Sequence, residues 1–121
     1  MKRIVFTREQ RKSILAKTGG HCAYCGTPLS IGAMQIDHVQ PLHLGGANDE
    51  TNLMPSCRSC NHYKSTLTLE KFRAQVTGMV EMLLRNNATF RNACRFGLIA
   101  VKPTPTKFEF FFEREEATRN D

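Results

Sequence analysis

The sequence predicts one small domain of the α+β class, and three observations support this. Its 121 residues suffice for a single hydrophobic core and are too few for two independent ones to be common. Two Cys-x-x-Cys pairs, at 22–25 and 57–60, enclose a region rich in Gly, Pro, His and Asn that lacks long periodic patterns. Helical periodicity is confined to the flanks of this region. We therefore expect a cysteine-stapled centre between flanking helices, within one domain over residues 1–121.

Composition and charge limit the classes of function. Hydrophobic residues make up 40% of the chain and charged residues 23%, which excludes a disordered or fibrous protein. The net charge of +6 favours a polyanionic partner such as nucleic acid, although the same excess can serve solubility alone. Residues 1–12 are basic and are not followed by an apolar stretch. We therefore expect no signal peptide, no membrane span and a cytoplasmic protein.

The elements expected first are a helix and two short strands. Thr7 and Gln10 have the spacing of a capping box, so a helix should start there and end at the glycines of 19–20. Residues 34–39 and 53–55 have the character of brief strands, and a Gly-Gly pair between them marks a turn. A second helix should begin shortly after the second strand, near residue 58.

One long amphipathic helix is expected next, ending near residues 86–87. Its apolar residues recur at spacings of three and four, which predicts that they form core. These residues are Leu69, Phe72, Val76, Met79, Val80, Leu83 and Leu84. A shorter helix over 90–95 should follow and end at Gly97.

The C-terminal tail, residues 97–115, predicts a β-hairpin. Two apolar segments flank a Pro-Thr-Pro-Thr turn, and Phe108, Phe110 and Phe112 alternate with other residues as in a strand. Phe111 interrupts that alternation. This favours packing of the aromatic rings within the protein over stacking on bases.

The four paired cysteines, Cys22, Cys25, Cys57 and Cys60, predict a zinc site. Disulfides are not expected in a reducing compartment, and four thiolates in two close pairs make a closed tetrahedral site. Closed coordination leaves no position for water, so this Zn²⁺ should be structural and not catalytic. The fifth cysteine, Cys94, is expected to be a buried apolar residue.

The sequence between and beside the cysteine pairs is more specific. It contains the following groups in order: Asp37-His38, Gly45-Gly46, Asn52-Leu53 and Cys57-x-x-Cys60-Asn61-x-x-Lys64. With these groups the chain resembles the HNH endonuclease family. The resemblance implies a ββα-metal core over residues 22–64, in which two strands and a helix enclose one divalent cation. Residues 65–121 would then be a C-terminal extension made of helices and the hairpin.

The resemblance also implies a catalytic role for each motif residue. His38 would activate water as the base, which suits an imidazole that is mostly neutral at pH 7. Asp37, on the opposite face of the strand, and Asn61 would hold the catalytic Mg²⁺ or Mn²⁺ through oxygen atoms. Asn52 would tie the loop after the first strand and so orient His38.

The helix carries the residues whose roles are less determined. Asn61 stands where the family name has its final His, and His62 follows it directly. We favour Asn61 as the metal ligand because it lies close to the helix face of Cys57, whereas His62 is turned about 100° further round. Lys64 could contact the scissile phosphate or be a solvated lysine. His43 matches no family position and receives no role.

The predicted function is hydrolysis of phosphodiester bonds in nucleic acid, for which we expect double-stranded DNA. The resemblance implies products with 5′-phosphate and 3′-hydroxyl ends. One alternative is a zinc-stapled module that binds nucleic acid without cutting it and has no need of Asp37, His38 and Asn61 together. Another is a protein-interaction domain that uses the Phe-rich tail and binds with little salt dependence. The target sequence and the oligomeric state do not follow from the sequence.

Overall fold

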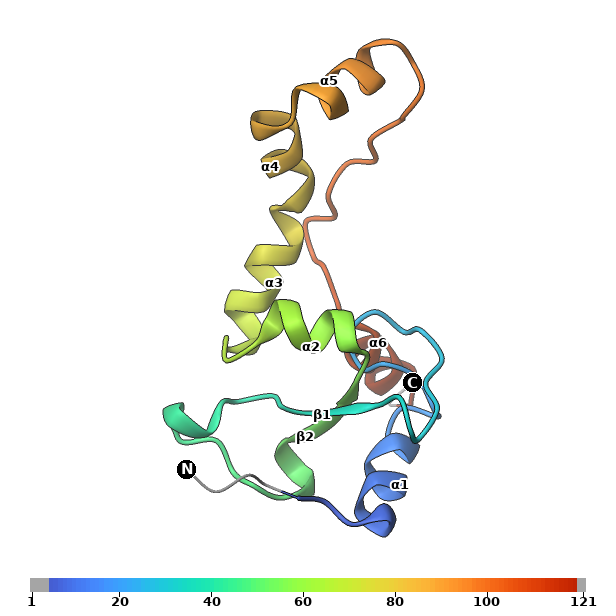
Figure 1. Ribbon diagram of the computed structural model, residues 1–121, viewed down its shortest axis with the longest axis vertical. Helices are drawn as coiled ribbons and strands as arrows, with labels where there is room; N and C mark the ends of the chain where they lie inside the picture. Colours follow the sequence, from blue (N-terminus) through green and yellow to red (C-terminus); the bar gives the residue numbers. More distant parts are fainter. Residues whose placement is uncertain (1–4, 120–121) are drawn as a thin grey trace. The chain divides into compact units, whose positions relative to one another are not determined.

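A computed structural model describes residues 5–119 (Figure 1). They form two compact units, the cysteine unit (residues 5–69 and 109–119) and the helical unit (residues 70–108). The α+β class is confirmed. In chain order the elements are α1 (Arg8–Ala16), β1 (Gln35–His38), η1 (Leu42–Leu44), η2 (Glu50–Asn52), β2 (Leu53–Ser56), α2 (Arg58–Lys64), α3 (Leu69–Thr77), α4 (Met79–Asn86), α5 (Ala88–Arg95) and α6 (Phe111–Arg119).

Helix α1 begins where the capping box predicted it. The Thr7 hydroxyl accepts from the Gln10 backbone N–H at 3.1 Å, and the Gln10 side chain accepts from the Thr7 backbone N–H at 2.8 Å. After α1 the chain turns through Gly20, whose φ of 86° would strain any residue with a Cβ. The predicted start of this helix is confirmed, and the helix ends at Ala16, three residues before the glycines predicted to stop it.

The two predicted strands pair as an antiparallel two-stranded sheet, with His38 opposite Leu53. Every residue of β2 is buried, whereas burial varies along β1. The hydrophobic core of the cysteine unit is small and is formed by Ile14, Met34 and Leu53 with partly buried neighbours. One side of β1 therefore remains available for functional groups.

Helix α2 starts at the second cysteine pair. Cys57 is extended, with φ of −73° and ψ of 162°, and its sulfur accepts from the Cys60 backbone N–H at 3.4 Å. The first cysteine of this pair is thus the N-cap of the helix as well as a thiol donor. The helix ends at Lys64 because Ser65 leaves the helical conformation, with a positive φ of 47°.

The helical unit differs from its prediction in the continuity of its first helix and in the burial of its apolar residues. The single long helix expected up to residues 86–87 is divided into α3 and α4 at Gly78. Apart from proline, glycine is the residue that favours a helix least. Among the apolar residues predicted to be core, Phe72 is buried, whereas Leu83 is 41% exposed. The shorter helix is confirmed as α5, which packs on α4 and is capped by Asn87.

The predicted C-terminal hairpin is wrong. Residues 98–110 contain no strand, and α6 begins at Phe111. The backbone N–H groups of Phe111 and Phe112 donate to the carbonyls of Tyr24 and Ala23, so they have no strand partner. The Glu113 carboxylate accepts from the Phe110 backbone N–H at 2.8 Å, which favours a helix start. Packing of the rings was predicted, and Phe110 and Phe112 are indeed buried.

The C-terminal segment 109–119 belongs to the cysteine unit. The rings of Phe110 and Phe112 meet the Tyr24 ring edge to face, with centroids 5.3 and 6.0 Å away. None of the helices described between residues 5 and 119 has the length and apolar character needed to span a bilayer. The assignment of residues 1–121 to one domain stays a prediction.

Candidate active site and metal centre

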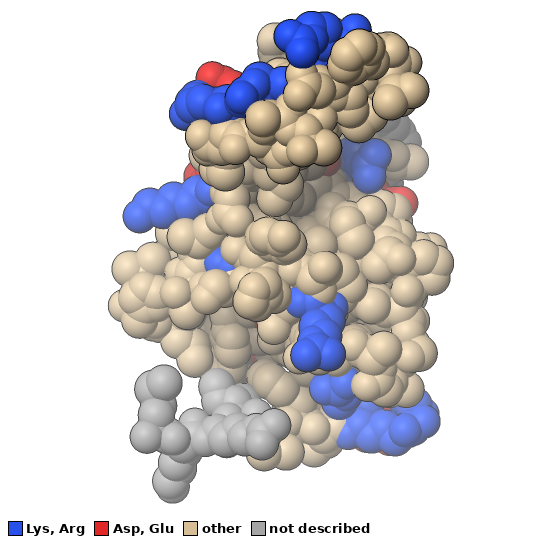
Figure 2. Space-filling model, turned by 45° about the horizontal axis from the view of Figure 1, so that its top comes forward, with Lys and Arg blue, Asp and Glu red and all other residues tan. Residues whose placement is uncertain are grey.

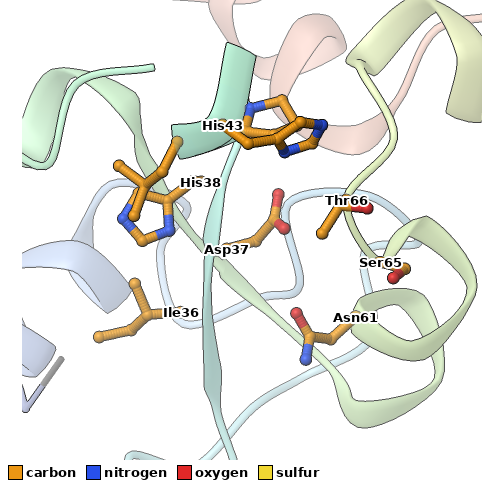
Figure 3. A pocket seen from close by; sticks show the side chains of 9 residues that line it. Ile36, Asp37, His38, His43, Asn61, Ser65 and Thr66 are labelled. Atoms are coloured by element: carbon orange, nitrogen blue, oxygen red, sulfur yellow. The ribbon is translucent and has the colours of Figure 1, made fainter. Parts of the chain in front are cut away.

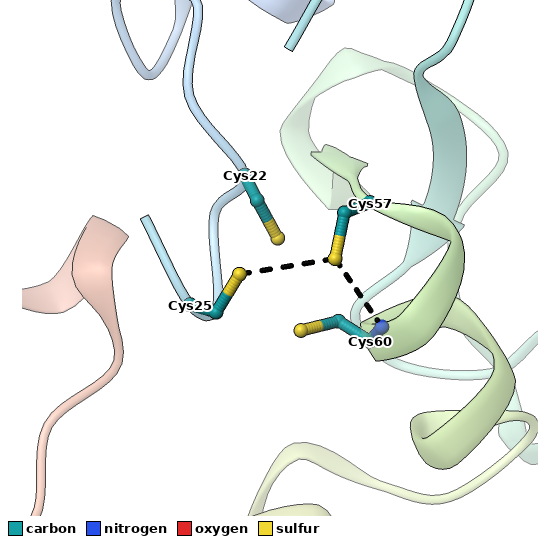
Figure 4. A group of neighbouring side chains, drawn as sticks. All are labelled: Cys22, Cys25, Cys57 and Cys60. Atoms are coloured by element: carbon teal, nitrogen blue, oxygen red, sulfur yellow. Dashed lines mark hydrogen bonds between the residues drawn. The ribbon is translucent and has the colours of Figure 1, made fainter. Parts of the chain in front are cut away.

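The four paired cysteines lie together although two of them come from a loop and two from the start of α2. Their sulfur atoms are all within 4.8 Å of one another, and Figure 4 shows them directed toward a common centre. The Sγ atoms of Cys25 and Cys57 are 3.8 Å apart. Zinc bound tetrahedrally by sulfur at about 2.3 Å requires sulfurs about 3.8 Å apart. The cluster can hold one metal ion, and its geometry fits zinc.

The cysteine cluster also has the electrostatics of a cation site. A hydrogen bond from the Cys60 thiol is the main cause that lowers the pKa of Cys22, and the same interaction raises the pKa of Cys60. The contact therefore favours the thiolate form of Cys22, with Cys60 as the donor. A thiolate is the form of cysteine that binds a metal ion. Cys94 is half-buried and stands outside this cluster.

A pocket of about 540 Å³ opens beside β1 and the C-terminal half of α2. It brings together three of the predicted catalytic residues, Asp37, His38 and Asn61, from two different elements. Figure 3 shows the Asp37 carboxylate and the His38 ring on opposite sides of β1, as expected for neighbours in a strand. The other lining residues are Ile36, Pro41, Leu42, His43, Ser65 and Thr66.

Asp37 is 5% exposed and is held by two donors. The Tyr24 hydroxyl donates to Oδ2, and the Lys64 ammonium lies 3.1 Å from Oδ2 and 3.3 Å from Oδ1. Burial raises the pKa of this carboxyl, while the hydrogen bond from Tyr24 and the charge of Lys64 oppose that rise. Burial likewise raises the pKa of Tyr24, so the phenol keeps its proton and stays a donor.

Lys64 is completely buried, which neither interpretation of the sequence anticipated. Besides Asp37, its ammonium donates to the backbone carbonyl of His38 at 3.0 Å. It is therefore not a solvated lysine, and it is not presented to a phosphate outside the protein. Its contacts with two consecutive residues of β1 instead fix the strand on which Asp37 and His38 lie.

His38 is oriented by a side chain that sequence reasoning did not identify. Its Nε2 lies 2.8 Å from Oδ1 of Asn48. An amide oxygen can only accept a hydrogen bond, so this contact places the ring proton on Nε2 and leaves Nδ1 as the basic nitrogen. The imidazole therefore has one nitrogen engaged in positioning and one able to take a proton.

Asn52 ties together the loop after β1. Its Oδ1 accepts from the Gln40 backbone N–H, and its Nδ2 donates to the carbonyls of Gln40 and Ala47, all at 2.8 to 2.9 Å. Within this loop the backbone at Gly46 lies so close to the backbone at Gln40 that a Cβ on Gly46 would be 1.8 Å from the Gln40 carbonyl oxygen. The hydrogen bonds of the Asn52 side chain go to the loop that carries Asn48 and not to the His38 ring.

Three residues of the site were missed from the sequence. Tyr24 and Asn48 contact Asp37 and His38 directly, and His43 lines the same pocket from η1. The sequence did not predict a role for Tyr24, because a residue between two paired cysteines is expected to shape the turn that they form. Its hydrogen bond instead reaches a carboxylate thirteen residues away. Asn48 lies in an irregular loop and His43 in the single short turn of η1, and neither has a repeating spacing that would predict the direction of a side chain.

Comparison with known proteins agrees with this geometry. Residues 22–66 match the family model described as HNH endonuclease. The chain is 39% identical over 44 residues to the CRISPR-associated endonuclease Cas9 of Corynebacterium diphtheriae, and 38% identical over 56 residues to that of Actinomyces naeslundii. These matches cover 36% and 46% of the chain, and they cover 4% and 5% of the two relatives.

A solved structure is also similar. It is a crystal structure of the Type II-C Cas9 enzyme from Actinomyces naeslundii, with a TM-score of 0.49 and 31% sequence identity. The match covers 59% of the chain and 8% of that protein. The chain thus corresponds to a small part of the curated relatives that it matches.

Proposed function

Because residues 22–66 carry the HNH endonuclease motif, we propose that the chain is a metal-dependent endonuclease that hydrolyses DNA phosphodiester bonds. The observation that carries the proposal is the single pocket that joins Asp37 and His38 of β1 to Asn61 of α2. These residue types supply a base and two oxygen ligands in one place. A binding module would need none of them in that arrangement.

His38 is the proposed base. With the ring proton held on Nε2 by Asn48, Nδ1 can take a proton from the water that attacks phosphorus. The Lys64 contact with the His38 carbonyl and the Asn52 contacts with the following loop keep the backbone on either side of the ring in place. Proper positioning of the base before substrate arrives favours catalysis, because little reorganisation remains to be done.

Asp37 and Asn61 are the proposed ligands of a divalent cation. Both line the pocket and offer oxygen atoms, the donors that Mg²⁺ and Mn²⁺ prefer. When bound, such an ion would neutralise charge that develops on the phosphate and the leaving oxygen. Asp37 would share its carboxylate with Lys64 and Tyr24, so these two residues position the ligand and balance its charge.

The four-cysteine cluster is the proposed site of a structural Zn²⁺. All four protein ligands are thiols, which leaves no open coordination position for a catalytic water. The ion would join the loop that bears Tyr24 to the start of α2, the helix on which Asn61 lies. Free thiols in such a cluster suit a reducing compartment, and we propose the cytoplasm as the place where the protein acts.

Plasmid nicking by the purified protein tests this function. We expect nicking with added Mg²⁺ or Mn²⁺, no nicking when the ion is omitted, and a loss of about 100-fold or more in His38→Ala. Omitting the ion is the better control, because a chelator would also threaten the zinc site. Zinc content and circular dichroism should be the same in both proteins.

A pair of neighbouring substitutions tests the metal ligand. Asn61→Ala should lose most of the nicking activity, whereas His62→Ala should retain it within a few-fold, because His62 is exposed and does not line the pocket. The opposite result would move the metal site to His62. Full activity of His38→Ala would refute the base, and no cleavage of any DNA or RNA by the wild type would favour a zinc-stapled binding module.

A further inference from the structure

Positive charge is distributed unequally between the two units. The helical unit, residues 70–108, contains seven Lys and Arg residues and two Glu residues, a net charge of +5. The remaining 82 residues, which include the candidate active site, contain ten cations and nine carboxylates. Nearly all of the chain's excess of +6 therefore lies outside the unit that carries the proposed chemistry.

The two carboxylates of the helical unit are already paired within single helices. Glu70 forms an ion pair with Arg73 at 3.1 Å on α3, and Glu81 forms one with Arg85 at 3.0 Å on α4. No other carboxylate is present in residues 70–108. The cations outside these two ion pairs include Arg91, Arg95, Lys102 and Lys107.

Several of these cations are exposed to solvent, so an anionic ligand can reach them. Arg95 donates to the Asn92 side chain at 2.6 Å and lies 5.8 Å from the Phe96 ring centroid, contacts that orient the guanidinium and leave its charge in place. Lys102 and Lys107 lie in the irregular segment after α5 and make no ion pair with any residue between 5 and 119. Figure 2 shows basic side chains with few acidic ones near them in the upper part of that view.

We propose that the helical unit is the surface by which the protein holds the nucleic-acid backbone, through contacts with phosphates that do not depend on sequence. This inference rests on the proposed function, since it assigns a surface to the same substrate. Duplex DNA carries one negative charge per about 1.7 Å of its axis, so a unit with a net charge of +5 releases several condensed counterions when its cations meet phosphates. The nearly neutral cysteine unit would gain little from this effect.

A basic surface with exposed apolar residues could also suit an anionic membrane, and Phe96 and Leu98 are 75% and 80% exposed. Membrane-surface helices, however, present a broad apolar face along a helix. Here α4 and α5 pack on one another, and the exposed apolar residues Leu98, Ile99 and Val101 follow α5 in an irregular segment. Nucleic acid is therefore the occupant that the charge distribution favours.

The test compares two triple variants that remove the same charge. One replaces the helical-unit residues Arg95, Lys102 and Lys107 by Gln, and its control replaces the exposed cysteine-unit residues Arg8, Lys12 and Arg114 by Gln. Both are made in the His38→Ala background, and affinity for a labelled duplex of about 30 base pairs is followed by fluorescence anisotropy from about 50 to 200 mM NaCl. The first variant should lose on the order of 100-fold in affinity at about 0.1 M NaCl, with a salt slope lower by about 2.7. The control should stay within a few-fold of the parent.

Two further measurements separate this inference from the proposed function. With His38 intact, the helical-unit triple variant should hydrolyse bis(p-nitrophenyl) phosphate as fast as the wild type, because this diester has no flanking phosphates to bind. If the wild type cleaves neither this diester nor DNA, the proposed function fails while the binding comparison still stands. Equal losses of affinity in both triple variants would overturn the inference. So would binding of the wild type to phosphatidylglycerol vesicles but not to the duplex.

Discussion

The cysteine unit and the helical unit bury different kinds of residue. In the cysteine unit, polar and charged groups are buried beside a small core: Thr18, Asp37, Ser56 and Lys64 are each 5% exposed or less. In the helical unit, Phe72 is the buried large side chain among the described residues, and Met82, Leu83 and Phe96 are exposed. The cysteine unit therefore depends on contacts that each need one particular partner. The helical unit relies on hydrogen bonds within its helices, which tolerate changes at the surface.

The largest effect is expected from Cys57→Ser. This substitution removes one of the four thiols, and Cys57 is also the N-cap of α2. The free energy of binding a structural zinc ion, about 10 kcal/mol or more, is comparable to the whole stability of a small domain. We expect loss of bound zinc and unfolding of the cysteine unit, measured by metal analysis and by amide hydrogen exchange.

Cys94→Ser is the matched control, because Cys94 lies outside the cluster, in α5. Its zinc content and thermal midpoint should stay close to those of the wild type. Amide exchange in α4 and α5 should also change little in Cys57→Ser, because no zinc ligand lies in these helices. If Cys57→Ser bound zinc as tightly as the wild type, the cysteine unit would not depend on this single thiol, and the proposed difference between the two units would not hold.

A smaller but still large effect is expected from Lys64→Met. The methionine fills much of the same space but leaves the Asp37 carboxylate buried without its counter-charge. Breaking a buried pair in this way typically lowers the free energy of unfolding by about 3 to 5 kcal/mol. Chemical denaturation of the zinc-loaded protein without added Mg²⁺ should show the loss, whereas Lys12→Met on the exposed face of α1 should not.

The loss in Lys64→Met should depend on pH. Burial already raises the pKa of Asp37 in the folded protein, and removing Lys64 raises it further. Between the unfolded value of about 4 and this raised value, the folded state keeps a proton that the unfolded state has lost. Stability contributed by that proton falls as pH rises through the folded pKa, so the variant should be closer to the wild type at the lowest pH at which both proteins keep their zinc than at about pH 7. An equal deficit at both values would contradict this account of Asp37.

Sequence patterns predicted those parts of the molecule whose interactions are local or have fixed spacing. The capping box at Thr7, the cysteine cluster and the positions of the two short strands were predicted because each depends on residue types that are close together or at set separations. The buried contact between Lys64 and Asp37 joins residues 27 positions apart and follows from no such rule. Proximity of Asp37, His38 and Asn61 was implied by the family resemblance and not by any periodic pattern.

The incorrect predictions came from patterns that tertiary contacts overrode. Alternating Phe residues in the tail indicated a strand, yet the backbone of Phe111 and Phe112 donates to the loop at residues 23–24. The apolar repeat across Gly78 predicted one continuous helix, but glycine gives little helical stabilisation and the helix is divided there. Periodicity identifies which residues prefer burial; it does not specify what they pack against.

The smallest effect is expected from Arg91→Ala in the helical unit. Its guanidinium donates to the carbonyls of Leu84 and Arg85, at 2.9 and 2.8 Å, and so satisfies the C-terminal end of α4. These bonds are exposed, so their loss should lower the stability of the α4–α5 pair by only about 1 kcal/mol. Amide exchange in α4 and α5 should rise several-fold in this variant, while exchange in β1 and α2 stays unchanged.

Arg95→Ala, which removes a neighbouring cation that contacts no α4 carbonyl, is the control. If Arg91→Ala instead destabilised the helical unit as strongly as Lys64→Met destabilises the cysteine unit, the helical unit too would depend on single partners, and the contrast between the two would not hold.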